Sequence, residues 1–302
     1  MKIGISGGGA SFDRAAEQAV EAENDGFSSL WYPSNSLGDP FVAMTVIGRA
    51  TTTIELGTAV VMTYGCHPTL MANRAAAVAA AIGRPITLGI GPSHAAAVEH
   101  VIGGSYATAG RHTEEYVSCL AALLRGDAVD HVGAEMTVRA TGPKDANVSL
   151  VVAALAPRML RVAGEHAAGT ITWMANARAI ATHVVPRIGA SASSAGKLSP
   201  RVICGVPIAV HDDVAEAREA AAAQWKVYGT LPNYQRILAI GGISSPAEAV
   251  IVGNEAAVRQ QVRALADAGV TDLWCAPFPV GTDRSASRQR TRSLLCELAA
   301  SS

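Results

Sequence analysis

Short apolar runs recur along this chain of 302 residues, and a stretch with helical periodicity follows almost every one. The stretch 86–94, with the sequence ITLGIGPSH, breaks into glycine and proline and then offers Ser93 and His94. Such a run is typical of a buried strand that ends in a loop. The same pattern predicts eight strands, at 2–6, 28–32, 54–61, within 86–94, and at 149–153, 169–172, 201–210 and 271–275.

Alternating strands and helices call for a parallel sheet. Eight such units in one chain favour a closed (β/α)8 barrel, the TIM barrel, over an open doubly wound sheet. No linker divides the chain, so we expect a single domain over 1–302. Three segments depart from the repeat: 128–139 alternates like a β-hairpin, 191–199 is a polar loop, and 229–252 is irregular. Helices are expected at 11–25, 39–49, 69–82, 111–125, 157–166, 177–190, 213–228, 255–268 and 285–299.

The composition limits what the protein can act on. Hydrophobic residues make up 49% of the chain and charged residues 16%, which suits a large core. The net charge is −1, so nothing favours binding to nucleic acid or to an anionic membrane surface. The five cysteines show no C-x-x-C spacing, the first residues show no signal-peptide pattern, and no apolar stretch is long enough to span a bilayer. We therefore expect a cytoplasmic protein with reduced thiols and a small-molecule substrate.

In a barrel of this kind, the active site is built from the loops that follow the carboxyl ends of the strands. Glycines at such a strand end let the backbone approach a bound ligand closely. The strand pattern therefore marks the candidate site segments 7–9, 33–36, 61–67, 91–94, 154–158, 172–176, 211 and 276–278.

Motifs of other enzyme classes fit this chain poorly. Ser6, in GISGG, still lies in its predicted strand, and Pro92 precedes Ser93, so neither serine matches the nucleophile elbow of a hydrolase. The glycines at 7–9 lack the G-x-G-x-x-G spacing of a dinucleotide-binding fold. No H-E-x-x-H occurs, so no metal site is expected.

Three basic residues near these loops have two interpretations each. Arg158 follows Pro157 at a strand-to-helix junction, where free N–H groups and the helix dipole favour an anion, although any such junction has this form. Arg111 opens a predicted helix and either lies in a solvated first turn or points at the site. His67 either precedes a helix cap or acts at the barrel mouth as a proton donor.

Several of these segments occur together in one known superfamily. They are LGTAV at 56–60 followed by HP at 67–68, LGIGPSH at 88–94, RHTEEY at 111–116, VAALAPRML at 152–160 and LADAGVTD at 265–272. The set resembles the bacterial luciferase-like monooxygenase superfamily, and it is most similar to the actinobacterial branch of coenzyme F420-dependent oxidoreductases. The resemblance covers nearly the whole chain, and the motifs come in the same order.

The resemblance implies a TIM barrel with insertions, a homodimer, and a cofactor at the barrel mouth. The cofactor of such relatives is the deazaflavin coenzyme F420 or, alternatively, flavin mononucleotide (FMN). A non-prolyl cis peptide between Ala59 and Val60 is implied behind the cofactor ring. The other cofactor-binding candidates are Thr58, Gly91, Pro92 and Ser93 near the ring, Arg111 if it points at the site, and Ala154, Leu155, Ala156, Pro157 and Arg158 around the phosphate.

The chain also departs from the pattern of its relatives. Relatives such as the sugar-phosphate dehydrogenases carry Asp-His after the second strand, where this chain has Ser34 and Asn35. That change removes an ionisable pair from near the ring, so the mechanism of those relatives does not carry over. Ala156 stands where glycine is common, which is a modest change if its φ stays negative.

The reaction implied by the resemblance is hydride transfer between coenzyme F420 and a small, apolar organic substrate. His94 and His67 are the candidates for donating a proton. The substrate pocket is expected to include Ser34, Asn35, Tyr64, Trp173 and Met174, of which the last two could equally be core residues. Two alternatives stay open. One is an FMN-dependent luciferase-like monooxygenase that uses oxygen, and the other is a non-catalytic flavin-binding protein.

Overall fold

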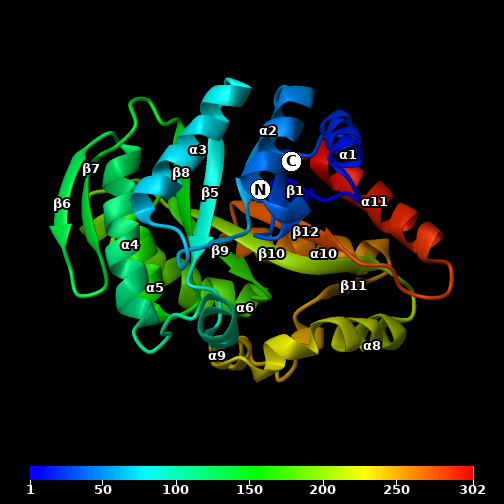
Figure 1. Cartoon of the computed structure of the whole chain (residues 1–302). Helices are drawn as coiled ribbons and strands as arrows, with labels where there is room; N and C mark the ends of the chain where they lie inside the picture. The colour runs from blue at the N-terminus through cyan, green and yellow to red at the C-terminus, as the bar shows by residue number, and fades with distance from the viewer. Residues whose placement is uncertain (302) are drawn as a thin grey trace.

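The computed structural model describes residues 1–301 and shows a closed barrel of eight parallel strands (Figure 1). The strands pair in the order β1-β2-β3-β5-β8-β9-β10-β12, and β12 pairs with β1 to close the ring. The predicted TIM barrel is confirmed. The barrel strands are β1 (Lys2–Ser6), β2 (Ser29–Tyr32), β3 (Glu55–Thr58), β5 (Ile86–Gly91), β8 (Val148–Ala153), β9 (Gly169–Trp173), β10 (Arg201–Val210) and β12 (Asp272–Pro277).

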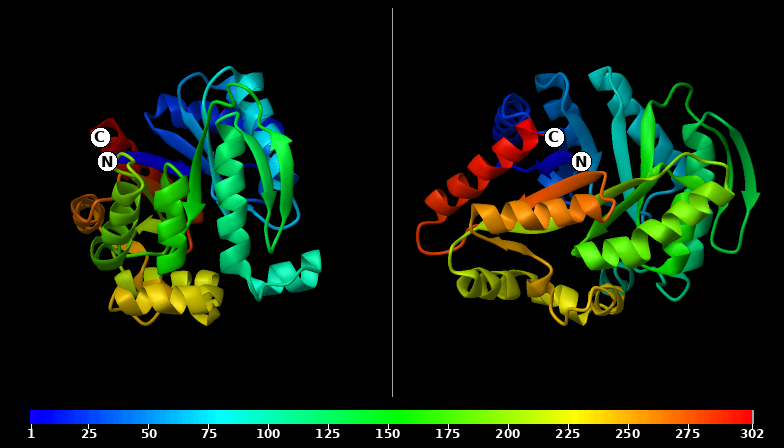
Figure 2. Two further views of the ribbon diagram at one scale, coloured as in Figure 1. Left: turned by 90° about the vertical axis from the view of Figure 1, so that its left-hand side faces the viewer. Right: turned by 180° about the vertical axis from the view of Figure 1, so that it is seen from behind.

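Helices surround the barrel on its outside (Figures 1 and 2). Ser11 accepts from the backbone N–H of Arg14 and so caps α1, as the sequence predicts, while Asp213 caps α8. The helices are α1 (Phe12–Asn24), α2 (Pro40–Ala50), α3 (Pro68–Ile82), α4 (Ala109–Leu124), α5 (Pro157–His166), α6 (Ala177–Ala179), α7 (Val185–Ser194), α8 (Val214–Trp225), α9 (Pro232–Ile240), α10 (Glu255–Asp267) and α11 (Arg284–Ala300).

Shorter elements complete the chain. The segments η1 (Ser36–Gly38), η4 (Lys226–Thr230) and η5 (Pro246–Glu248) are 3-10 turns, and η2 (Ala97–Ile102) and η3 (Ile180–Val184) are π-helical. The predicted hairpin is confirmed as β6 (Ala128–Val132) and β7 (Thr137–Thr141), which stands outside the barrel beside α4 (Figure 2). No described helix is long and apolar enough to cross a membrane.

Aromatic rings fill the inside of the barrel. Trp31 and Trp274 pack there with Val151, Ile171 and Ile203. Gly205 on β10 makes room for this packing, because a Cβ at that position would clash with the indole ring of Trp274. The barrel is therefore a packed core, and only its mouth is left to bind a ligand.

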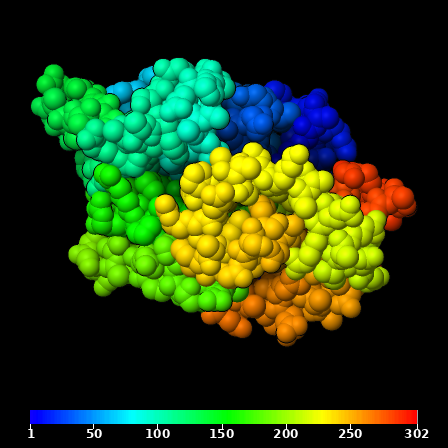
Figure 3. Space-filling view, turned by 90° about the horizontal axis from the view of Figure 1, so that it is seen from below, coloured from blue at the N-terminus to red at the C-terminus, as the bar shows by residue number. Residues whose placement is uncertain are grey.

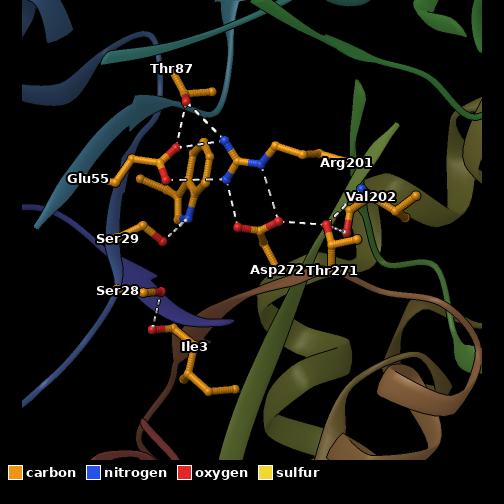
Figure 4. Close-up of polar contacts among 10 residues, drawn as sticks. Ile3, Ser28, Ser29, Glu55, Thr87, Arg201, Val202, Thr271 and Asp272 are labelled. Carbon is orange, nitrogen blue, oxygen red and sulfur yellow. Dashed lines mark hydrogen bonds and ion pairs between the residues drawn. The ribbon is translucent and has the colours of Figure 1, made fainter. Parts of the chain in front are cut away.

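A cluster of charged side chains, of which Asp272 is buried and Arg201 and Glu55 are partly buried, lies at the opposite end, where the strands begin (Figure 4). The guanidinium of Arg201 on β10 bonds both Glu55 on β3, at 2.9 Å, and Asp272 on β12, at 2.6 Å. The Thr87 hydroxyl donates to Glu55, and the Thr271 hydroxyl donates to Asp272. These contacts tie four strands, β3, β5, β10 and β12, together at the end of the barrel opposite the mouth.

Three sequence-based expectations need correction. The strand expected at 54–61 is interrupted, because β3 ends at Thr58 and a separate short strand, β4 (Val61–Met62), pairs with β5. The loop expected at 191–199 begins later, since α7 continues to Ser194. The irregular segment 229–252 contains α9 and a strand, β11 (Ile251–Gly253), that pairs with the far end of β10.

Candidate active site at the barrel mouth

The peptide between Ala59 and Val60 is cis, as the resemblance implies. It lies between β3 and β4, beside β5. The Thr58 hydroxyl donates to the carbonyl of Gly89 at 2.7 Å and accepts from its N–H at 2.8 Å. The N–H of Ala59 donates to the carbonyl of Tyr32 at 2.7 Å. The neighbouring strands β2 and β5 thus hold this bend in place.

Small side chains form the floor of the mouth. Ala59, Val60 and Ala153 pack on the tryptophan core of the barrel and are still partly exposed. Gly91 closes the gap between them, because a Cβ there would lie 2.9 Å from the Cβ of Ala153. We call these four residues the floor. Its apolar surface of small side chains can receive one face of a ring system.

The loop after β5 carries His94. Ser93 has a φ of 63°, in the left-handed region, and the Tyr106 hydroxyl donates to its carbonyl at 2.8 Å. The ring nitrogens of His94 bond to no residue within 1–301. Burial lowers the pKa of His94 below its usual 6.5, so the imidazole is neutral at pH 7. A neutral imidazole with unused nitrogens can donate or accept a proton.

An aromatic wall stands beside the floor. The Trp173 ring lies 4.9 Å from that of Trp274 and 6.3 Å from that of Tyr228, between ring centroids. The Tyr234 ring lies 4.7 Å from the Tyr228 ring and 6.0 Å from the imidazole of His94. Tyr228 comes from η4, where the expected helix 213–228 is replaced after Trp225, and Tyr234 comes from α9, within the segment 229–252 expected to be irregular. We call Trp173, Tyr228, Tyr234 and His94 the aromatic wall.

The start of α5 is the predicted anion site. Ala156 is the N-cap residue but offers no side chain to the first N–H groups, and its φ is −92°, so its replacement of glycine costs little. Pro157 occupies the first turn. The unbonded N–H groups there can bind a phosphate. The guanidinium of Arg158 turns toward Glu114 on α4, at 2.7 Å, which offsets part of its charge.

A buried histidine contacts the carbonyl of Leu155 in the same junction. The buried ring of His183, on η3, lies 2.8 Å from that oxygen through Nε2. Ala154 and Leu155 are themselves buried. His183 was not among the predicted site residues, and no local pattern near it would have identified it.

His67 does not lie with His94. Its Nδ1 accepts from the N–H of Thr69 and caps α3, and its Nε2 lies 3.0 Å from the carbonyl of Thr137 on the hairpin. Both ring nitrogens are therefore engaged, and the cap is the interpretation that the geometry supports. Arg111 likewise pairs with Glu135 at 2.5 Å and is half-exposed, which matches a solvated first turn.

The residues expected to line the substrate pocket lie in different places in the structure. Trp173 belongs to the aromatic wall, but Met174 is only 1% exposed and packs in the core. Ser34 and Asn35 lie in a turn after β2, with Asn35 exposed. The Tyr64 ring stacks on the imidazole of His112 at 4.0 Å and lies 6.3 Å from the ring of Tyr106, between ring centroids.

Comparison with known proteins identifies the family. The profile of the luciferase-like monooxygenase family matches residues 2–272. A 5,10-methylenetetrahydromethanopterin reductase of Methanolobus tindarius is 25% identical over 93% of this chain and 86% of its own length. A 4-hydroxyprotoasukamycin monooxygenase of Streptomyces nodosus subsp. asukaensis is 26% identical over 76% of this chain and 69% of its own length.

Solved structures share the fold at low identity. An F420-dependent secondary alcohol dehydrogenase, bound to an F420-acetone adduct, has a TM-score of 0.77 at 18% identity and covers 97% of both chains. The oxygenating constituent of 3,6-diketocamphane monooxygenase from Pseudomonas putida, bound to FMN, has a TM-score of 0.76 at 16% identity, over 100% of this chain and 98% of that one. With the barrel, the cis peptide and the family match together, the chain belongs to the luciferase-like monooxygenase family.

Proposed function

We propose that this protein is an oxidoreductase that transfers a hydride between coenzyme F420 and a small organic substrate. The observation that carries the proposal is His94, a neutral imidazole with unused nitrogens on the loop beside the floor. Reduction by hydride adds two electrons and one proton to the acceptor, and the product needs a second proton. In this proposal, His94 holds that proton.

The residues at the mouth fit a deazaflavin or a flavin. Val60, Gly91 and Ala153 would lie beneath its ring, because they form a flat apolar surface without bulk. The free N–H groups at the start of α5 would hold its phosphate. When bound, the coenzyme supplies the hydride, and the protein supplies orientation and the exclusion of water.

Two relatives support the deazaflavin, and another supports an alternative. The alcohol dehydrogenase and a tetrahydromethanopterin reductase of Methanopyrus kandleri, both F420-dependent, share this fold. The Streptomyces monooxygenase, at 26% identity, and the structure of the FMN-bound 3,6-diketocamphane monooxygenase constituent favour a second candidate function, an FMN-dependent monooxygenase that uses oxygen. The same floor would serve either cofactor, so binding preference is the deciding measurement.

The test is a parallel titration of the protein with coenzyme F420 and with FMN, followed by quenching of tryptophan fluorescence. Ala153→Leu raises the floor and should weaken cofactor binding at least about tenfold, the equivalent of 1.4 kcal/mol. Arg139→Ala, in an exposed pair on the hairpin, is the matched control and should bind as the parent does.

Each result has a clear meaning. Tight binding of F420 with far weaker binding of FMN supports the proposal. Preference for FMN, together with oxygen uptake, moves the monooxygenase to first place. Binding without turnover against any acceptor favours a flavin-binding protein. Binding of neither compound would overturn the cofactor assignment.

A further inference from the structure

The chain between α8 and β11, residues 226–250, covers the barrel mouth. Figure 3 looks onto this face, and the atoms of that segment, coloured yellow to gold, lie across its centre. We call residues 226–250 the cover. It includes η4 and α9, which carry Tyr228 and Tyr234.

Internal contacts set the position of the cover. The side-chain amide of Asn176, at the start of α6, donates to the carbonyl of Gly241 at 3.0 Å. Gln235 on α9 donates to the carbonyl of Gly229, and Arg218 on α8 donates to that of Ala247. The cover is thus bonded within itself and to two neighbouring helices, so Tyr234 has a defined place above the mouth.

Tyr234 has an unused polar group in an apolar setting. The residue is 8% exposed, and its ring packs between Tyr228 and His94. Its hydroxyl bonds to no residue within 1–301. Burial raises the pKa of Tyr234, with a smaller contribution from Tyr228, so the phenol stays protonated and neutral. The Tyr234 O–H group can therefore donate a hydrogen bond to a ligand at the mouth.

The floor and the aromatic wall carry no charged side chain. The floor consists of alanines, a valine and a glycine, and the wall of rings that are neutral at pH 7. Such a surface cannot compensate a carboxylate or a phosphate for its lost hydration. It does match a flat conjugated molecule, because aromatic faces attract one another and exclude water.

These observations point to one class of substrate, and this inference rests on the proposed function. We infer that the mouth accepts an uncharged, planar, conjugated carbonyl compound, which lies against the aromatic wall while the Tyr234 hydroxyl donates to its oxygen. A site built to donate to an oxygen also rejects analogues without that oxygen, because the hydroxyl is then left unpaired. Tyr234 is thereby a specificity-determining residue.

The test uses three probes that share a phenyl ring on a three-carbon chain ending in a carbonyl or carboxylate carbon: neutral, planar 4-phenylbut-3-en-2-one, its saturated analogue 4-phenylbutan-2-one, and the anion trans-cinnamate. Calorimetry measures their binding to the parent protein, with and without oxidised cofactor. We expect the planar ketone to bind at least about tenfold more tightly than either comparison compound. Equal or tighter binding of trans-cinnamate would overturn the inference.

The variant Tyr234→Phe keeps the ring and removes only the hydroxyl. We expect it to bind the planar ketone about tenfold more weakly and to bind the cofactor as the parent does. The control Arg139→Ala, in the exposed pair on the hairpin, should change neither. Unchanged ketone binding in Tyr234→Phe contradicts the inference even if F420 is the cofactor. Loss of cofactor binding by the parent protein contradicts the proposed function instead, and the ketone titration without cofactor still decides the role of Tyr234.

Discussion

His94 and Tyr106 come from the same connection, between β5 and α4, but have different roles. The imidazole is free to exchange a proton, whereas the Tyr106 hydroxyl is committed to the carbonyl of Ser93. One residue acts on the substrate in our proposal, and the other keeps the loop that carries it in place. Substitutions at the two positions should therefore separate chemistry from positioning.

His94→Gln removes the titratable group and keeps a polar side chain of similar reach. We expect the rate of hydride transfer to fall about 10²-fold or more, because general acid catalysis contributes on that scale. The affinity for the cofactor should stay the same. Stopped-flow oxidation of the reduced cofactor in the presence of substrate measures the rate of hydride transfer. Fluorescence titration measures the affinity for the cofactor. A variant with the parent rate would exclude His94 as proton donor.

Tyr106→Phe removes the hydroxyl that holds Ser93. Loss of this hydrogen bond should lower the free energy of unfolding by about 1 kcal/mol, as urea denaturation measures it. We also expect a lower kcat with little change in cofactor affinity, because His94 loses its fixed position. Tyr64→Phe is the matched control, since the Tyr64 hydroxyl is buried without a partner and its loss should cost nothing. Equal behaviour of the two variants would refute the positioning role.

At the scale of elements, the end of α1 and the loop before β3 are joined by one carboxylate. Glu23 accepts from the N–H groups of Thr52, Thr53 and Ile54 at 2.9, 2.5 and 2.8 Å. Burial by itself would raise the pKa of Glu23, but the backbone hydrogen bonds from Thr53, Ile54 and Thr52 outweigh it and lower the pKa from 4.5 to about 2. The bound carboxylate therefore favours the folded state.

This pKa fixes the direction of a pH effect. The folded pKa of Glu23 is depressed, so its stabilisation is complete above pH 4.5 and is lost as the pH falls toward 2. We expect the urea midpoint of the parent to fall more steeply over that range than the midpoint of Glu23→Gln. Glu21→Gln, on an exposed position of the same helix, should keep the parent slope. Parallel curves for the parent and Glu23→Gln would contradict this assignment.

The sequence predicts the repeating strands and helices and the hairpin, but not the structure of the cover. The strands were recognisable because buried apolar runs end in glycine or proline, as at 86–94. The cover was missed because glycines and prolines surround α9, although Pro232 followed by apolar residues at 234, 237 and 238 is a helical signal. The contacts of Tyr106 with Ser93 and of His183 with Leu155 depend on tertiary packing, which no local pattern encodes. The cis peptide was expected from the resemblance alone.

For the molecule as a whole, the ion cluster at the closed end holds strands that are distant in the sequence. Arg201→Ala would leave the carboxylates of Glu55 and Asp272 without their partner, and Asp272 is only 3% exposed. We expect the free energy of unfolding to fall by about 3–5 kcal/mol, as urea denaturation measures it. Arg139→Ala removes an exposed pair and should cost less than about 1 kcal/mol. Similar losses in both variants would show that burial of the cluster is unimportant.

The homodimer implied by the resemblance stays a prediction. Val42 on α2 and Leu70 on α3 are 49% and 58% exposed, and the two helices are neighbours. If a second copy covers this face, Leu70→Arg should shift the mass measured by light scattering from dimer to monomer. Val132→Arg, on the hairpin and also exposed, is the control and should leave the mass unchanged. A monomeric parent protein would rule the prediction out.

The pairing of β1 with β12 joins Ile3 to Leu273, almost from one end of the chain to the other. During synthesis, the ring cannot close until β12 has left the ribosome. Until then, β1 and β10 each present an unpaired edge, which is the kind of surface that recruits other chains into aggregates. The yield of folded protein should therefore be limited by the time for which the barrel of the nascent chain stays unclosed. Slower growth at low temperature, or added chaperone, should raise that yield more than any substitution at the barrel mouth.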